Sequence, residues 1–115
     1  MTDDRILDEL QKATEGLLYM SESDYPFELV CWDGSVDLTT EYLCEVAGKP
    51  AASPILELSV EQFLGGAFVT VATVLKRHLS DLRVYKVGLI NIPVYVVGRS
   101  PDGNWVGLST RVVET

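Results

Sequence analysis

The residues best placed to do chemistry in this chain are four consecutive polar ones, Ser21 to Asp24, which read Ser-Glu-Ser-Asp. Two carboxylates and two hydroxyls in a row can accept hydrogen bonds, face a cation or, beside a base, act in acid–base catalysis. The apolar run Leu17 to Met20 precedes them and Tyr25-Pro26 follows, where Pro26 pushes Tyr25 toward an extended conformation. A short acidic loop is therefore expected between two apolar anchors, of which the run before it is expected to be buried or covered.

Two interpretations of this loop are open from the residues alone. It is either a solvated connection between a helix and a strand, which is ordinary at this length, or Glu22 is a presented carboxylate. In the second case the acid would face a cation or a basic pocket on a partner. The apolar anchors tether the loop well, whichever interpretation holds.

Signatures of an enzyme are weak. His78 is the only histidine and falls on an expected helix, where a packed or surface role outweighs a catalytic one. One histidine with the separated Cys31 and Cys44 cannot supply a standard zinc site, and the two cysteines are expected to be buried thiols in a reducing compartment. Gly65-Gly66 lacks the ending of a phosphate loop. We expect no catalysis, no cofactor and no resident metal; a small hydrolase using Ser21 or Ser23 with His78 is a third and weaker hypothesis.

Composition predicts one globular domain over residues 1–115, with 47% hydrophobic and 23% charged residues. Seventeen acidic against nine basic residues give a net charge of −8, which argues against direct binding of nucleic acid. The charge suits solubility, and it equally suits a partner with a basic groove. The sequence shows neither a signal peptide nor a run long enough to span a membrane, so a cytoplasmic protein is expected.

Helices and strands must position the acidic loop. Apolar residues at three- and four-residue spacing predict a helix from Asp3 to Glu15, closed by Gly16. A strand over Phe27–Trp32 follows, then a short helix capped by Thr39 or Thr40 and stopped by Gly48 and Pro50. Further along, the pattern predicts a strand over Pro54–Leu58, a capping box at Ser59 and Gln62, and a helix reaching from Phe63 to Leu82.

The remainder of the chain is expected to be β, with strands over 84–89, 94–99 and 105–114. Asn91-Ile92-Pro93 is expected to be one turn, and Ser100 to Asn104 a hairpin turn, because Pro and Gly match its backbone. In the last strand every second residue is expected to face the core. These elements predict the α+β class, as an α/β/α sandwich in which helices flank a central, mostly antiparallel sheet.

The stretch GLLYMSESDYPFE at residues 16–28, with Val30 to Gly34, resembles the corresponding segment of the nuclease A inhibitor family. The C-terminal half is similar in order and spacing, through the motifs at residues 84–86, 94–98 and 101–104 and the ending STRVVET at 109–115. The resemblance implies a non-enzymatic protein that inhibits a sugar-non-specific nuclease by occupying its active site.

The resemblance also implies roles for single residues. Glu22 would enter the nuclease active site in place of the scissile phosphate, and Thr115 would reach the magnesium ion of the nuclease. Ser21, Ser23 and Asp24 would shape the loop. The partner is then a metal-dependent nuclease of DNA and RNA, and the metal belongs to that partner.

One departure from the family pattern concerns a second contact. The pattern carries an acidic insertion with an Asp-Trp pair before the long helix, whereas this chain runs directly through residues 59–67 without it. Losing such an aromatic anchor costs about 2 kcal/mol, roughly thirtyfold in affinity. Trp105, expected on the face opposite Val106, is either a substitute contact or an ordinary packed tryptophan. The alternative function is an acidic regulatory module that uses the same scaffold to bind a partner other than a nuclease.

Overall fold

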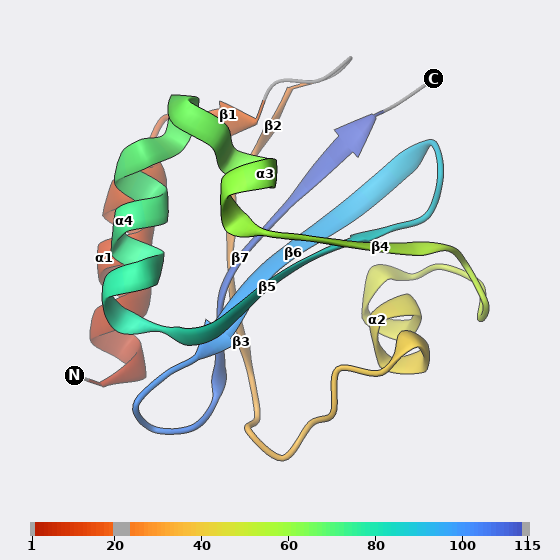
Figure 1. Ribbon diagram of the computed structural model, residues 1–115, viewed down its shortest axis with the longest axis horizontal. Coiled ribbons are helices and arrows are strands. Elements are labelled where there is room, and N and C mark those ends of the chain that lie inside the picture. Colours follow the sequence, from red (N-terminus) through yellow and green to blue (C-terminus); the bar gives the residue numbers. More distant parts are fainter. Residues whose placement is uncertain (1, 20–23, 114–115) are drawn as a thin grey trace.

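An antiparallel five-stranded sheet forms the centre of the protein in the computed structural model, which describes residues 2–19 and 24–113. The sheet has the order β3-β7-β6-β5-β4 (Figure 1). Its strands are β3 (Glu28–Trp32), β4 (Ile55–Leu58), β5 (Ser80–Val87), β6 (Asn91–Arg99) and β7 (Trp105–Val113). Two short strands, β1 (Leu18–Tyr19) and β2 (Tyr25–Pro26), pair with each other ahead of β3.

Helices cover both faces of the sheet. The helices α1 (Asp3–Thr14), α3 (Val60–Leu64) and α4 (Val69–His78) lie on one face, with the 3-10 turn η1 (Gly65–Phe68) between the last two. The helix α2 (Thr40–Ala47) packs on the other face (Figure 1). The α+β class is therefore confirmed, with helices on the two sides of an antiparallel sheet.

Alternation along the central strands explains why two cores form. Val94 and Val96 of β6 pack with the α1, α3 and α4 side, whereas Tyr95 and Val97 pack with α2. Successive side chains of a strand point to opposite faces, so a strand covered on both sides must be apolar at nearly every position. Seven consecutive residues of β6 are buried, as this argument requires.

Local signals placed several elements correctly. Thr39 caps α2 by accepting from the Tyr42 amide at 3.1 Å, and the capping box of Ser59 with Gln62 is present in α3. The hairpin turn between β6 and β7 closes through two backbone hydrogen bonds between Ser100 and the residues Gly103 and Asn104. Trp105 and Val106 do face opposite sides of the sheet.

The expected helix from Phe63 to Leu82 is wrong at two points. Gly65 has a φ of +60° and ends α3, so α4 starts only at Val69. Leu82 belongs to β5, because the chain becomes extended at Leu79 immediately after α4. The expected turn at 91–93 is also wrong, since Asn91 begins β6 and the bend lies at residues 88–90.

Two further expectations about apolar residues need correction. Cys44 is buried, but Cys31 is exposed on the edge strand β3; both thiols are free. Burial and the negative charges of Asp3 and Asp4 raise the pKa of the Cys31 thiol, so it remains protonated at neutral pH. In the run before the acidic loop, Leu18 keeps 46% of its surface exposed rather than being covered.

Candidate functional site

An aromatic cluster fixes the strand that leads into the acidic loop. The ring of Tyr19 in β1 stacks on Phe63 with centroids 4.3 Å apart and also contacts Phe68 and Phe27. Its hydroxyl donates to the carbonyl of Phe63 at 2.7 Å. Stacked and edge-to-face pairs stabilise beyond the area they bury. The N-terminal anchor of the loop is therefore attached to α3 and η1.

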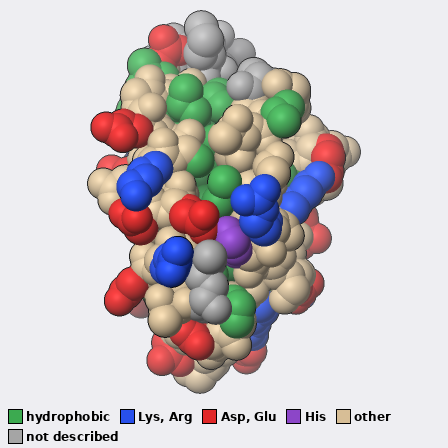
Figure 2. All heavy atoms as spheres, turned by 90° about the vertical axis from the view of Figure 1, so that its left-hand side faces the viewer, with side chains coloured by type: hydrophobic (Ala, Val, Ile, Leu, Met, Phe, Trp, Pro, Cys, Tyr) green, Lys and Arg blue, Asp and Glu red, His purple; other side chains and the backbone are tan. Residues whose placement is uncertain are grey.

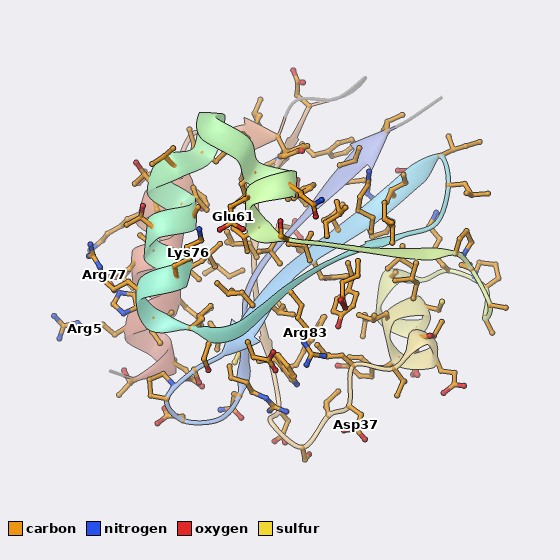
Figure 3. All side chains as sticks on the ribbon, in the orientation of Figure 1. Arg5, Asp37, Glu61, Lys76, Arg77 and Arg83 are labelled. Carbon is orange, nitrogen blue, oxygen red and sulfur yellow. The ribbon has the colours of Figure 1, made fainter. Side chains whose placement is uncertain are left out.

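A salt bridge on the surface joins α3 to α4. Glu61 of α3 and Lys76 of α4 form an ion pair (Figure 3), which lowers the pKa of the Glu61 carboxyl through its hydrogen bond to Lys76. Both side chains are exposed, so the pair contributes little to stability. It does, however, bridge the break at Gly65, close to the residues that hold Tyr19.

The hydroxyl of Thr110 ties β2, the strand that follows the loop, to the central sheet. Thr110 of β7 donates from Oγ1 to the backbone carbonyl of Pro26 at 3.0 Å and lies 3.4 Å from that of Tyr25. Thr110 is only 8% exposed and shares its face with Val106, Leu108 and Val112. Sequence reasoning missed this contact, although a hydroxyl on a buried apolar face is a signal that a partner exists.

The anchors on both sides of the loop are also paired with each other. Tyr19 faces Tyr25, and Leu18 faces Pro26, in the β1–β2 ladder. The chain between these strands contains the predicted loop. Asp24 directly precedes β2 and is exposed. Ser21, Glu22 and Ser23 lie outside the described residues.

The end of β7 lies at the same end of the sheet as β1 and β2. Because Glu28 of β3 pairs with Ser109 and the strands are antiparallel, β2 runs beside the last part of β7 (Figure 1). Val113 is the last described residue of that strand, and Thr115, the second predicted contact, lies outside the described residues. The described segments flanking both predicted contacts therefore emerge at one end of the molecule.

A hollow of about 320 Å³ opens on the α2 side of this end. Tyr25 and Pro26 line one side of it, Pro93 and Tyr95 the other, and Arg111 contributes a cation. Burial raises the pKa of the Tyr95 phenol, which Arg111 partly opposes, so the phenol is neutral at physiological pH. The hollow offers hydrogen-bond donors and acceptors, with the cation of Arg111 and the carboxylate of Glu28 among its lining residues.

His78 lies far from the described anchor of the acidic loop. It ends α4, and its Nε2 lies 2.6 Å from a carboxylate oxygen of Glu9 in α1. Figure 2 shows part of this imidazole at the surface of the helical face, among acidic and basic side chains. The loop anchor Tyr19 contacts Phe68 at the other end of α4, and the helix rises about 15 Å between the two. A hydrolase that pairs His78 with Ser21 or Ser23 has no support from this placement.

Trp105 is also distant from the end of β7. It is the first residue of the strand and Val113 the last, so about 26 Å of strand separates them. Trp105 is 3% exposed, its Nε1 donates to the Val36 carbonyl at 3.1 Å, and the Arg99 guanidinium lies 4.0 Å from its ring centroid. Its ring is packed and offers little surface to a partner.

The described residues contain no group of acids, cysteines or histidine that could hold a metal ion. No helix in the described part of the chain is long and apolar enough to cross a membrane.

A family model described as "Nuclease A inhibitor-like protein" matches the chain over residues 4–69 and 65–115. The two matched segments together span nearly the whole sequence and meet at η1 and the first residue of α4. No curated protein matches the chain.

Proposed function

The chain belongs to the nuclease A inhibitor-like family, and from this membership we propose that it inhibits a metal-dependent, sugar-non-specific nuclease by occupying the active site. Glu22 stands in for the scissile phosphate, and Thr115 at the end of the chain contacts the magnesium ion of the nuclease. The protein itself performs no catalysis. Ser21, Ser23 and Asp24 shape the loop that carries Glu22.

The observation that supports this proposal is the shared position of the two flanking segments. Thr110, five residues before Thr115, holds the backbone of β2, which directly follows the acidic loop. An inhibitor that inserts an acid and a chain end into one pocket needs both to leave the scaffold on the same side. The hydrogen bond from Thr110 to Pro26 holds the two segments side by side and limits the conformational freedom lost on binding.

Electrostatics supports the same partner. A nuclease must neutralise phosphates with basic residues, so the net charge of −8 on this chain accelerates encounter with it. The carboxylate of Glu22 loses water on insertion, and cations in the pocket offset that cost. Oxygen ligands from the chain end suit magnesium, which prefers hard donors.

Substitution of Glu22 by Gln tests the proposal. The change removes one charge and keeps the shape, so inhibition of the target nuclease should weaken by about thirtyfold or more, with the melting temperature nearly unchanged. Glu45→Gln is the matched control, because Glu45 is exposed on α2, whereas the loop anchor Tyr19 packs against α3 and η1 on the opposite face of the sheet. It should inhibit like the wild type. A short extension beyond Thr115 should weaken inhibition as Glu22→Gln does.

Equal potency of wild type, Glu22→Gln and the extended chain would contradict the assigned contacts. The missing Asp-Trp insertion favours one alternative, an acidic module that regulates a partner other than a nuclease. A pull-down distinguishes the two: retention of another protein in place of any nuclease would support the alternative and end the inhibitor proposal.

A further inference from the structure

The turn between β5 and β6 presents two large aliphatic side chains to solvent. Leu89 is 71% exposed and Ile90 62%, and they are the two most exposed large hydrophobic residues in the described part of the chain. Tight turns normally carry Gly, Asn, Asp, Ser or Pro, because those residues suit the backbone or bind it. Packing gives no reason for two adjacent aliphatic residues here, and contiguous exposed apolar surface commonly marks an interaction site.

The turn is held in a fixed place beside the end of β7. Asn91, the residue after Ile90, pairs with Val113, and the Arg111 guanidinium donates to the Asn91 side chain at 3.1 Å. On the other side, the Gly88 amide donates to the Pro54 carbonyl at 2.8 Å. Figure 1 shows the turn and β2 on opposite sides of the end of β7.

We propose that Leu89 and Ile90 form an apolar contact with the same nuclease that receives Glu22, on a non-polar surface at the edge of its cationic groove. The inference rests on the proposed function and extends it to a third element. A partner that takes up both the acidic loop and the end of the chain must cover this end of the sheet, and the turn lies within that end.

The surface at this end of the sheet is continuous, which supports a nuclease as the partner of the turn. The hollow lined by Tyr25, Pro93 and Arg111 spans the sheet end from β2 across β7 to β6. Beyond it, β6 begins at Asn91, next to the turn. The strands that anchor the acidic loop, the last part of β7 and the apolar turn are thus parts of one rim.

Charge argues against a second copy of the chain as the occupant. Each copy carries a net charge of −8, and the exposed Asp24 lies beside β2 at this same end, so two copies meeting here would repel each other. A basic nuclease would be attracted to the same rim. The acid then accelerates association, and the apolar pair slows dissociation once the complex has formed.

The test is the double variant Leu89→Ser and Ile90→Ser, with Val46→Ser as the matched control. Val46 is an exposed aliphatic residue on α2, outside the turn. Binding to a nuclease that the wild type inhibits is followed by surface plasmon resonance. The double variant should bind about tenfold more weakly or worse, through a faster dissociation rate, with the association rate unchanged within twofold. Val46→Ser should match the wild type.

Three results would overturn the inference while leaving the proposed function intact. The double variant could bind like the wild type, or Val46→Ser could lose as much affinity as the double variant. Alternatively, analytical ultracentrifugation could show a wild-type dimer that the double variant cannot form, which would make a second copy the occupant. If instead the wild type inhibits no metal-dependent nuclease, the proposed function fails, and this inference fails with it.

Discussion

Replacement of Thr110 by Val tests whether one hydroxyl positions the acidic loop. The side chains are nearly equal in volume, so the change removes the donor that reaches the carbonyls of Pro26 and Tyr25 and leaves the packing of β7 in place. Thr110 is 8% exposed, whereas Pro26 is exposed. The hydrogen bond to the Pro26 carbonyl is only partly buried, so water can replace the lost donor and limit the cost.

The magnitude follows from that exposure. A hydrogen bond of this kind contributes about 1 kcal/mol, and the larger penalty for a fully buried, unsatisfied acceptor does not apply to a bond that is only partly buried. We expect the free energy of unfolding to fall by about 1 kcal/mol and the melting temperature by roughly 4 °C. If the lost tether must be restored on binding, about 1 kcal/mol converts to about a fivefold rise in the inhibition constant.

Urea unfolding, amide hydrogen exchange and inhibition assays together separate positioning from stability. The amides of β1 and β2 should exchange faster in Thr110→Val, while those in the middle of β6 should not. Thr73→Val is the control, because its hydroxyl donates only to the Val69 carbonyl within α4. Unchanged exchange in β1 and β2 together with unchanged inhibition would refute the tether, even if the melting temperature fell as expected.

Two further predictions concern the scaffold. Gly107→Ala should lower the free energy of unfolding, measured in urea, by about 3 kcal/mol or more, because the added Cβ would overlap the backbone carbonyl of Val96 in the neighbouring strand. Gly66→Ala is the control: the space at that position is open, so the free energy of unfolding should change little. The hydroxyl and amide of Ser35 hold the pKa of Asp33 below its usual range, so this contribution to stability is present above about pH 4 and is lost as the pH falls. NMR titration should show the Asp33 pKa rising in Ser35→Ala, and an unchanged value would contradict the role of the hydroxyl.

Local chemistry in the sequence was sufficient for elements whose ends carry their own signals. Thr39 and the Ser59–Gln62 box predicted helix starts correctly because a side-chain cap depends on residues three apart. Gly48 likewise ends α2 with a left-handed φ of +68°. These interactions are complete within one turn of chain, so no knowledge of the tertiary structure is needed.

The failures arose where tertiary pairing outweighed local preference. Asn91 to Pro93 resembled a turn, but the sheet extends β6 through them, and the ladder with β5 stops at Val94. Pro93 therefore has a ladder partner only in β7, an edge-like position in which a residue without an amide hydrogen is tolerated. No local pattern shows that β7 continues as far as Val113 beside them.

The candidate site could likewise be predicted only in part from the sequence. The apolar anchors of the loop could be predicted from their position, and Tyr19 and Phe27 do pack against the helices. The Thr110 tie to Pro26 could not, because it joins residues 84 positions apart. Glu22 and Thr115 were assigned from the family resemblance, and their roles remain predictions.

The two ends of β7 are stabilised by different means, and this bears on how the scaffold can carry an interface. At the Trp105 end, Arg99 donates to the carbonyls of Gly34 and Gly103 at 2.7 Å, and Asn104 joins Gly34 to Asp3. These bonds connect α1, the turn after β3 and the β6–β7 turn. At the other end of β7, Thr110 bonds to β2 and Arg111 to Asn91.

Residues that stabilise the fold and residues proposed to bind a partner therefore lie toward opposite ends of β7. Substitutions at the Trp105 end should act on stability, since its residues are buried or bonded to one another and lie about 26 Å from Val113. The other end also carries exposed residues such as Leu89 and Ile90, whose side chains are little used by the fold, and substitutions of these should act on binding. A chain built in this way can vary its contact residues at small cost to folding, so relatives on the same scaffold can acquire different partners without redesigning the core.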